Sequence, residues 1–330
     1  MTKNQEIKKI LVTGGAGFIG SHLIETILKK TSSRIVCIDN FDDAYDPRLK
    51  QRNIEPFLKN LRFILYKNDI RDLTKMKQIF KKEKPDAIVH LAAKADTRKA
   101  VLSPFEYISV NIEGTLNLLE CSREFGIKKF VFASSSSVYG NKNSAPFSEE
   151  DQTDFPLSPY GASKKAAEIL IYTYHHNFNL PAICLRVFNA YGERMRPNLV
   201  LPLWLKKMLN GEPIEMSGDG TRRRDFTYVG DTVNAIMLAL KKPFDFEIIN
   251  IGNSRPLTLN QLLHVLEKAA GITATVYKRP SHHASVEQTH ASTKKAKHLL
   301  GWKPLMPIEK GVKRFVSWAR NGGLEDIHKR

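Results

Sequence analysis

Cysteine is scarce in this sequence. The three cysteines, Cys37, Cys121 and Cys184, stand far apart inside apolar stretches. Such spacing fits neither a disulfide framework nor the paired thiols of a metal site, so we expect three buried, free thiols. Long apolar runs are missing as well, because none approaches the roughly 20 residues that a membrane-spanning helix needs. Residues 1–9 are polar and lead straight into an expected strand, so no signal peptide is predicted and a cytoplasmic location is expected.

Acidic residues are too few to balance the basic ones. The chain has 51 lysines and arginines against 34 aspartates and glutamates, which gives a formal net charge of +17. The excess either solvates the surface or attracts an anionic partner. Because the sequence has no helix-turn-helix signature, no ribonucleoprotein motif and no basic tract interleaved with aromatic residues, we expect no nucleic acid partner. A small phosphorylated substrate is compatible with this charge.

A glycine-rich turn between an apolar run and an amphipathic stretch is the most informative feature. Gly14, Gly17 and Gly20 form a G-x-x-G-x-x-G pattern. The first glycine permits a tight turn, the second lets backbone approach a pyrophosphate, and the third allows the next helix to pack against the strand. The helix N-terminus then faces the phosphate charge. Glycine-rich turns also occur in ordinary loops, so the pattern needs its context to predict a dinucleotide site.

A carboxylate supplies that context. A second apolar run, 34–38, ends on Asp39, nineteen residues after Gly20. An acid at this position is placed to hold both ribose hydroxyls of an adenosine. It would repel a 2′-phosphate, and its neighbour Asn40 brings no positive charge, so the sequence favours NAD over NADP.

Strand and helix patterns alternate through residues 1–188. Such units with short joins predict an α/β fold with a Rossmann-like, doubly wound parallel sheet that forms an NAD-binding domain. After Asn189, prolines divide short elements, and 189–330 is expected to form mainly a smaller C-terminal substrate-binding lobe, with some segments returning to the sheet. Strands are expected at 62–66, 87–91, 129–133, 182–188, 224–229, 247–251 and 274–278, and helices at 21–30, 74–82, 104–125, 160–177, 231–240, 258–270, 293–300 and 307–318.

His90 lies within the apolar run at 87–91, and we interpret it as a packed core histidine. The small residues Ala92 and Ala93 follow, as suits a strand end close to a cofactor. The adjacent pair His282-His283 is interpreted as solvated, because no acidic or thiol partner stands at ligand spacing, and no metal site is predicted.

Tyr160 and Lys164 form a Y-x-x-x-K pair at the start of an expected helix, where residues four apart share one face. A cationic lysine beside a tyrosine stabilises the phenolate and lowers its pKa, so that the tyrosine can act as a base near neutrality. The pair follows a serine cluster, 134–137, by about 25 residues, and this cluster ends an expected strand. In a parallel sheet such strand ends line the ligand crevice, so a serine hydroxyl there is placed to hold a substrate oxygen.

Together these motifs resemble the extended short-chain dehydrogenase/reductases, in particular the NAD-dependent nucleotide-sugar epimerases and dehydratases. The similarity spans nearly the whole chain and rests on TGGAGFIG at 13–20, HLAA at 90–93, SSSVYG at 135–140, SPYGASK at 158–164, RVFNAYG at 186–192 and RDFTYV at 224–229. It implies bound NAD and a nucleoside-diphosphate sugar that is oxidised at C4.

The resemblance also implies a role for individual residues. Tyr160 is expected to take the proton from the sugar O4 while Ser135 hydrogen-bonds that oxygen, and Lys164 is expected to tune Tyr160 and hold the nicotinamide ribose. The cofactor-binding residues implied are Gly14, Gly17, Phe18, Ile19, Gly20, Asp39, Asn40, Asp69, Ile70, Leu91, Ala92, Ala93, Asn111, Tyr160 and Lys164. The substrate-binding residues implied are Arg98, Ser136, Ser137, Asn189, Arg196 and Arg224, whereas Arg222 and Arg223 are expected to be solvated.

Two neighbours of Ser135 discriminate within the family. Related dehydratases carry Asp and Glu where this chain has Ser136 and Ser137, and related decarboxylases carry a Glu at the second place. Neither acid is present, so the resemblance favours C4 epimerisation. It implies a 4-keto sugar that turns over in its pocket before the hydride returns to the other face.

The stretches 39–47 and 194–198 are most similar to UDP-glucuronate 4-epimerases, which suggests UDP-glucuronate as the substrate. Arg196 is suited to a bidentate pair with a carboxylate, although a surface arginine in a basic loop is the alternative. Departures from that pattern are Asn189 for Thr, Asn198 for Asp, and the segment 281–286 for a P-G-D-V-like run that closes over the nucleotide.

Two other functions stay open at this point. The first is a UDP-glucose/UDP-galactose 4-epimerase, and the second is a non-catalytic NAD-binding protein on the same fold. The family resemblance also suggests a homodimer in which the helices at 104–125 and 160–177 pack across a two-fold axis.

Overall fold

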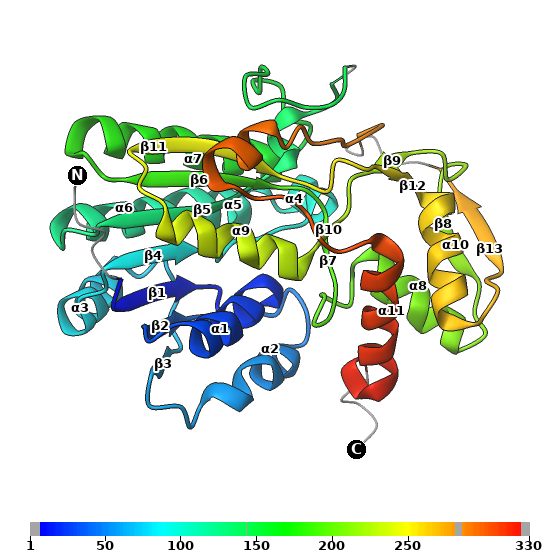
Figure 1. Ribbon diagram of the computed structural model, residues 1–330, viewed down its shortest axis with the longest axis horizontal. Coiled ribbons are helices and arrows are strands. Elements are labelled where there is room, and N and C mark those ends of the chain that lie inside the picture. The colour runs from blue at the N-terminus through cyan, green and yellow to red at the C-terminus, as the bar shows by residue number, and fades with distance from the viewer. Residues whose placement is uncertain (1–6, 143, 281–285, 325–330) are drawn as a thin grey trace.

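A computed structural model of the chain describes residues 7–142, 144–280 and 286–324. One parallel sheet organises the molecule, with the strand order β11-β6-β5-β4-β1-β2-β3 (Figure 1). Its strands are β1 (Lys9–Thr13), β2 (Arg34–Ile38), β3 (Phe63–Tyr66), β4 (Ala87–His90), β5 (Lys129–Ser135), β6 (Ala182–Val187) and β11 (Phe246–Ile251). Because the chain runs outward in both directions from β1 and β4, the predicted doubly wound sheet is confirmed.

Helices cover both faces of this sheet. Ile10 and Val12 pack into the core beneath α1 and α9, whereas Leu11 packs into the core beneath α3, α6 and α7. Successive strand side chains point to opposite faces, so a sheet covered on both sides needs continuous apolar runs rather than alternating ones. The helices are α1 (Phe18–Lys30), α3 (Leu73–Glu83), α6 (Gly114–Glu124), α7 (Pro159–Phe178) and α9 (Val229–Lys241).

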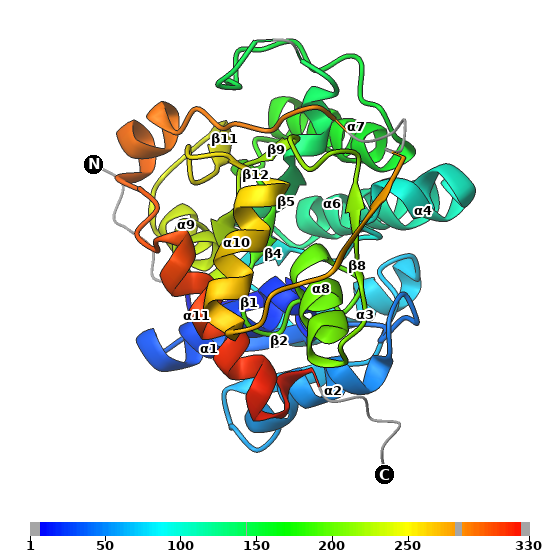
Figure 2. The ribbon, with the colours of Figure 1, turned by 90° about the vertical axis from the view of Figure 1, so that its right-hand side faces the viewer.

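A smaller lobe lies beyond the carboxyl ends of the sheet strands, at the right of Figure 1 and facing the viewer in Figure 2. Its main elements are α8 (Val200–Leu209), β8 (Ile214–Ser217), α10 (Leu259–Ala270), β13 (Val276–Arg279) and α11 (Ile308–Trp318). β8 and β13 pair in parallel, and α10 packs against α8 and α11. The lobe is interrupted, because β11 pairs with β6 and α9 packs against α1 in the large sheet domain. The domain boundary at residue 188 stays a prediction.

Several elements differ from expectation. The helix predicted at 104–125 consists of α5 (Pro104–Ile108), a π-helical turn (Ser109–Glu113) and α6. The strand predicted at 224–229 is two short strands, β9 (Arg223–Arg224) and β10 (Thr227–Tyr228), because Asp225 turns inward between them. Its buried carboxylate accepts hydrogen bonds from the backbone N–H groups of Asn253, Ser254 and Ala291. β9 pairs with β12 (Leu257–Thr258), and β10 pairs with β7 (Ala190–Tyr191).

Among the α-helices of the described residues, three were not predicted from the sequence: α2 (Pro47–Ile54), α4 (Thr97–Leu102) and α8. In α8, Pro202 sits in the first turn, where a backbone N–H has no partner within the helix, so the proline costs no helical hydrogen bond. In α2 and α4, aspartate side chains at the N-cap, Asp46 and Asp96, accept backbone hydrogen bonds and start the helix.

The interpretation of the cysteines and of His90 is confirmed. Cys37, Cys121 and Cys184 are buried and free. His90 is 1% exposed, with Nδ1 2.7 Å from Thr13 Oγ1 and Nε2 2.9 Å from Thr115 Oγ1. Within the described part of the chain, no helix is both long and apolar enough to cross a membrane. His282 and His283 lie outside the described residues, as does the predicted nucleotide-closing segment except for Val286.

Candidate active site

A pocket of about 1420 Å³ lies at the carboxyl ends of the sheet strands and extends under the small lobe. Open parallel sheets bind their ligands at this edge. The structure brings together here every predicted site residue but one. The pocket is lined by Gly14, Gly17, Phe18, Ile19, Gly20, Asp39, Asn40, Asp69, Ile70, Leu91, Ala92, Ala93, Arg98, Ser135, Ser136, Ser137, Tyr160, Lys164, Asn189, Arg196 and Arg224.

The exception is Asn111, which stands behind the pocket wall on the π-helical turn and is 2% exposed. Its amide oxygen accepts from the backbone N–H of Lys94 at 2.8 Å, and its Nδ2 donates to Ser163 Oγ at 2.9 Å. Asn111 thus ties the loop after β4 to the helix that carries Tyr160. It supports the wall and does not itself line the cavity.

The glycine-rich turn forms a cradle that leaves no room for side chains. Gly14 has φ +67°, and a Cβ there would lie 2.7 Å from the backbone nitrogen of Ala92. A Cβ on Gly20 would lie 2.3 Å from the carbonyl oxygen of Gly14. Backbone N–H groups and the N-terminus of α1 therefore face the pocket directly, an arrangement that fits the pyrophosphate of a dinucleotide.

Asp39 lies beside this cradle and is 6% exposed. Its carboxylate accepts from the backbone N–H groups of Ala16, at 3.0 Å, and Phe41, at 2.9 Å. Burial raises the pKa of Asp39 above its usual range, an effect that the charge of Lys50 opposes. Lys50, on the unpredicted helix α2, is itself buried and donates to Asp42 Oδ1 at 2.8 Å. Because Asp42 accepts this hydrogen bond, Lys50 is not free to offer its charge to a 2′-phosphate.

Ser135, Tyr160 and Lys164 meet at the opposite side of the pocket. Ser135 ends β5, and its Oγ accepts from the backbone N–H of Ser137 at 3.1 Å. Ser158 caps α7 by accepting from Gly161 N–H at 3.2 Å, which places Tyr160 and Lys164 in the first turns of the helix, on one face. This is the arrangement that the sequence motifs predict.

The electrostatics of Tyr160 differ from expectation. Burial raises the pKa of the phenol, while a hydrogen bond with Ser135 and the charge of Arg196 act in the opposite direction. Lys164 does not supply that charge here: its Nζ donates to the carbonyl of Ala133 at 2.8 Å, and burial lowers the pKa of Lys164 to about 7. The positive charge that favours the phenolate therefore comes from Arg196, on the small-lobe side of the pocket.

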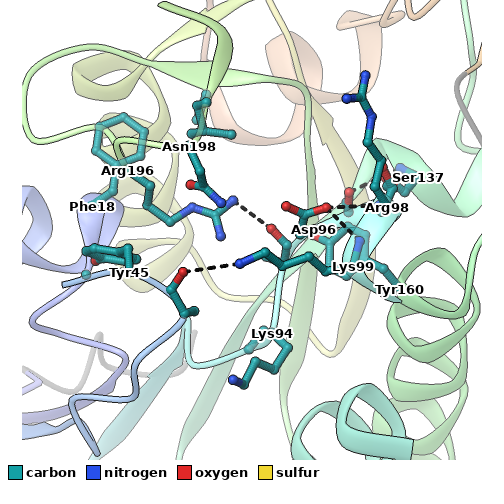
Figure 3. A pocket seen from close by; sticks show the side chains of 18 of the residues that line it. Phe18, Tyr45, Lys94, Asp96, Arg98, Lys99, Ser137, Tyr160, Arg196 and Asn198 are labelled. Carbon is teal, nitrogen blue, oxygen red and sulfur yellow. Dashed lines mark hydrogen bonds between the residues drawn. The ribbon is translucent and has the colours of Figure 1, made fainter. Parts of the chain in front are cut away.

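Arg196 points into the pocket and not onto an outer loop (Figure 3). Its Nη2 donates to the carbonyl of Ala95 at 2.6 Å. The Oδ1 atom of Asn198 is also buried in the wall and has no hydrogen-bond partner in the described part of the structure. Asn189 is already engaged, because its Nδ2 donates to the Asp225 carbonyl and to Thr289 Oγ1, both at 3.1 Å.

Some pocket residues were missed from the sequence. Lys94 bridges Asp42, at 2.8 Å, and Glu106, at 2.6 Å, and Asp96 lies between Arg196 and Arg98 in Figure 3. The sequence could have indicated them, because they follow the H-L-A-A motif directly and so lie at a strand end that faces the crevice.

The prediction that Arg222 is solvated was wrong, because its side chain is only 14% exposed and lines the pocket, whereas Arg223 is exposed as predicted.

Metal chemistry finds no support in the described residues, because no group of three or more His, Cys, Asp or Glu side chains among them is arranged to hold an ion. The pocket instead combines a phosphate-binding cradle, a buried serine–tyrosine–lysine group and several arginines. Such a site can bind two phosphorylated ligands and exchange a proton between one of them and the Tyr160 phenol.

Comparison with known proteins agrees with this description. The chain is 42% identical to a UDP-glucuronate 4-epimerase of Thermodesulfobacterium geofontis over 94% of this chain and 95% of that protein. It superposes on a UDP-glucuronic acid 4-epimerase of Bacillus cereus, crystallised with UDP-glucuronic acid and NAD, with a TM-score of 0.89, 37% identity, and 95% and 99% of the two chains covered. A UDP-glucose 4-epimerase of Thermotoga maritima, crystallised with UDP-glucose, gives a TM-score of 0.88 at 33% identity, with the same coverage. The model of the NAD dependent epimerase/dehydratase family matches residues 10–252, and the chain belongs to that family.

Proposed function

We propose that this protein is an NAD-dependent UDP-sugar 4-epimerase, and that its substrate is UDP-glucuronate, converted to UDP-galacturonate. The observation that carries the reaction is the meeting of Ser135, Tyr160 and Lys164 in one pocket with the glycine cradle. A non-catalytic NAD-binding protein would not need this group. The buried, free cysteines agree with a cytoplasmic location, where thiols stay reduced.

Each protein group has a defined part in this reaction. The glycine cradle and Asp39 hold the dinucleotide, with Asp39 on the adenosine ribose. Tyr160 removes the proton from the sugar O4 and later returns it, and Ser135 holds that oxygen against the phenol. Bound NAD supplies the hydride acceptor and donor. Lys164, 3% exposed, lines the pocket with Tyr160 and would hold the nicotinamide ribose, while Arg196 favours the phenolate.

Arg196 supports glucuronate as the sugar. Its guanidinium faces the cavity and already binds one oxygen, the carbonyl of Ala95. A planar guanidinium binds a carboxylate through two parallel hydrogen bonds, which a hydroxymethyl group cannot replace. UDP-glucose/UDP-galactose epimerisation is the competing function.

We expect the protein as purified, without added cofactor, to epimerise UDP-glucuronate and not UDP-glucose. NMR of both reactions side by side measures this. In Arg196→Met we expect kcat/KM for UDP-glucuronate to fall by about 100-fold or more, because a charge-assisted bidentate pair is lost. Arg196→Lys keeps the positive charge but cannot form two parallel hydrogen bonds, so its kcat/KM should lie between those of the parent and of Arg196→Met. Product from UDP-glucose alone would leave the mechanism intact and reject glucuronate as the substrate.

We also propose that the chain forms a homodimer through α5, α6 and α7. Phe105 and Ile108 on α5 are 85% and 50% exposed, and Ile169 and Tyr172 on α7 are 51% and 50% exposed. Each pair is spaced three residues apart and so lies on one helix face, and α5 packs against α7. Apolar side chains gathered on adjacent helices are typical of an interface between subunits.

Phe105→Glu combined with Ile169→Glu is expected to convert the dimer to a monomer, because two charges would be buried at each copy of the interface. Sedimentation velocity at micromolar concentration measures the change. Leu61→Glu is the matched control, since Leu61 is 94% exposed and lies just before β3, away from these helices. A parent protein that sediments as a monomer would reject the dimer.

A further inference from the structure

Arg222 lines the pocket and holds an unused hydrogen-bonding group in its wall. Its side chain is 14% exposed, and Nη2 lies 3.0 Å from Glu287 Oε1. Nη1 is fully buried and has no hydrogen-bond partner in the part of the chain that the structure describes. A buried guanidinium N–H without an acceptor is unfavourable, and such groups commonly mark the place of a ligand.

The surroundings of Arg222 favour an anion. Arg224, two residues on, donates through Nη2 to the Val286 carbonyl at 2.7 Å and also lines the pocket. Burial, together with the nearby charge of Arg222, lowers the pKa of Arg224 to about 10. Two like charges held together in a poorly solvated wall repel each other, and a bound anion would relieve this repulsion.

The charge balance of this wall matches a diphosphate. Four cations, Lys207, Arg222, Arg224 and Arg279, stand beside two carboxylates, Glu215 and Glu287. Glu215 pairs with both Lys207 and Arg279, and Glu287 pairs with Arg222. Two positive charges are therefore in excess among these residues. The diphosphate of a nucleoside-diphosphate sugar carries two negative charges, which would balance them.

This wall belongs to the small lobe and is separate from the glycine cradle. The carbonyl of Arg222 accepts from Leu259 N–H at 3.1 Å, at the start of α10. Ser217, the last residue of β8, also lines the pocket, and its buried Oγ has no partner among the described residues. The dinucleotide cradle lies instead on α1 and β1, so the two phosphate-binding regions serve different ligands.

We propose that Arg222 binds the diphosphate of the nucleotide-sugar substrate through Nη1, next to Arg224, and so sets the affinity for the nucleotide part. This assignment rests on the proposed function, because it takes the second ligand of the pocket to be a nucleotide sugar. Arg222 is a binding residue only. The diphosphate is remote from the sugar C4, so the contact contributes equally to the ground state and to the transition state.

Isothermal titration of the NAD-containing protein with uridine, UMP and UDP tests this assignment. Arg222→Gln is expected to weaken UDP binding by about 10- to 100-fold and UMP binding by less, and to leave uridine binding unchanged. KM for the sugar nucleotide should rise by a similar factor, with kcat within about two-fold of the parent. Arg223→Gln removes the same charge from the exposed neighbour and should change none of these values.

The outcomes separate the assignment from the proposed function. Parent-like UDP affinity in Arg222→Gln overturns the assignment, and so does an equal loss for uridine, which would indicate contact with the base. Arg222→Lys, a milder change, should give an intermediate UDP affinity if the first variant folds poorly, and parent-like affinity there would also count against the assignment. UDP binding that depends on Arg222 without any epimerisation would support the assignment and reject the proposed function.

Discussion

Tyr160→Phe is expected to lower kcat by about 10³-fold while NAD stays bound, because the variant loses the group that exchanges the O4 proton. The phenol lies in the pocket with Ser135, and its ring packs edge-on against Tyr107 with centroids 6.4 Å apart. Phenylalanine keeps this ring contact, so the variant should fold normally. Epimerisation followed by NMR gives the rate, and ultraviolet absorbance of the denatured protein gives the NAD content.

Tyr172→Phe is the matched control, since Tyr172 lies on the same helix but is 50% exposed and outside the pocket. Its kcat should stay within about two-fold of the parent. A Tyr160→Phe variant that retains parent-like turnover would show that another group carries the proton. Loss of NAD together with activity would instead assign Tyr160 to cofactor retention.

Arg186→Leu is expected to lower the free energy of unfolding by about 3–5 kcal/mol, because it leaves the buried carboxylate of Glu168 without its charged partner. Arg186 and Glu168 are each 2% exposed, and they form two hydrogen bonds, Nε to Oε1 at 2.9 Å and Nη2 to Oε2 at 2.8 Å. Glu168 Oε1 also accepts from Ser134 Oγ, and Arg186 Nη1 contacts Tyr139 Oη at 3.0 Å. Urea unfolding monitored by fluorescence measures the loss.

An exposed ion pair provides the comparison. Lys77 lies 2.7 Å from Glu124 with both side chains more than 40% exposed, so Lys77→Ala should lower the free energy of unfolding far less than Arg186→Leu does. The double variant Arg186→Leu, Glu168→Leu should recover part of the lost stability, because no unpaired charge is left. Equal losses for Lys77→Ala and Arg186→Leu would contradict this view of the buried pair.

The sheet was predictable because its signals are local. Gly14, Gly17 and Gly20 need only a strand before them and a helix after them, and Asp39 needs only to end the next strand. The two residues of the Y-x-x-x-K pair, Tyr160 and Lys164, are brought together by helix geometry alone. These features do not depend on how the small lobe folds, and the structure places them in one pocket.

The rest depends on contacts between distant segments. Arg222 was expected to be solvated like Arg223, but it lines the pocket and pairs with Glu287, which lies 65 residues away in sequence. Lys164 was expected to act on Tyr160, but its Nζ reaches the Ala133 carbonyl in β5, and Arg196 from the small-lobe side supplies the nearby charge. The π-helical turn at 109–113 also left no trace in the hydrophobic pattern. The spacing of residues within one segment does not predict contacts with segments that are distant in the sequence.

The path of the chain between the sheet domain and the small lobe limits which segments can be exchanged between related proteins. β6, which precedes the predicted boundary at residue 188, receives its outer neighbour, β11, from residues 246–251. A fragment that ends at 188 would therefore expose the backbone hydrogen-bonding groups of an apolar strand, and such an edge recruits other chains. Joining the halves of two relatives at residue 188 would pair β6 of one parent with β11 of the other. A chimera must exchange the regions on either side of β11 separately and keep the strand with its own sheet.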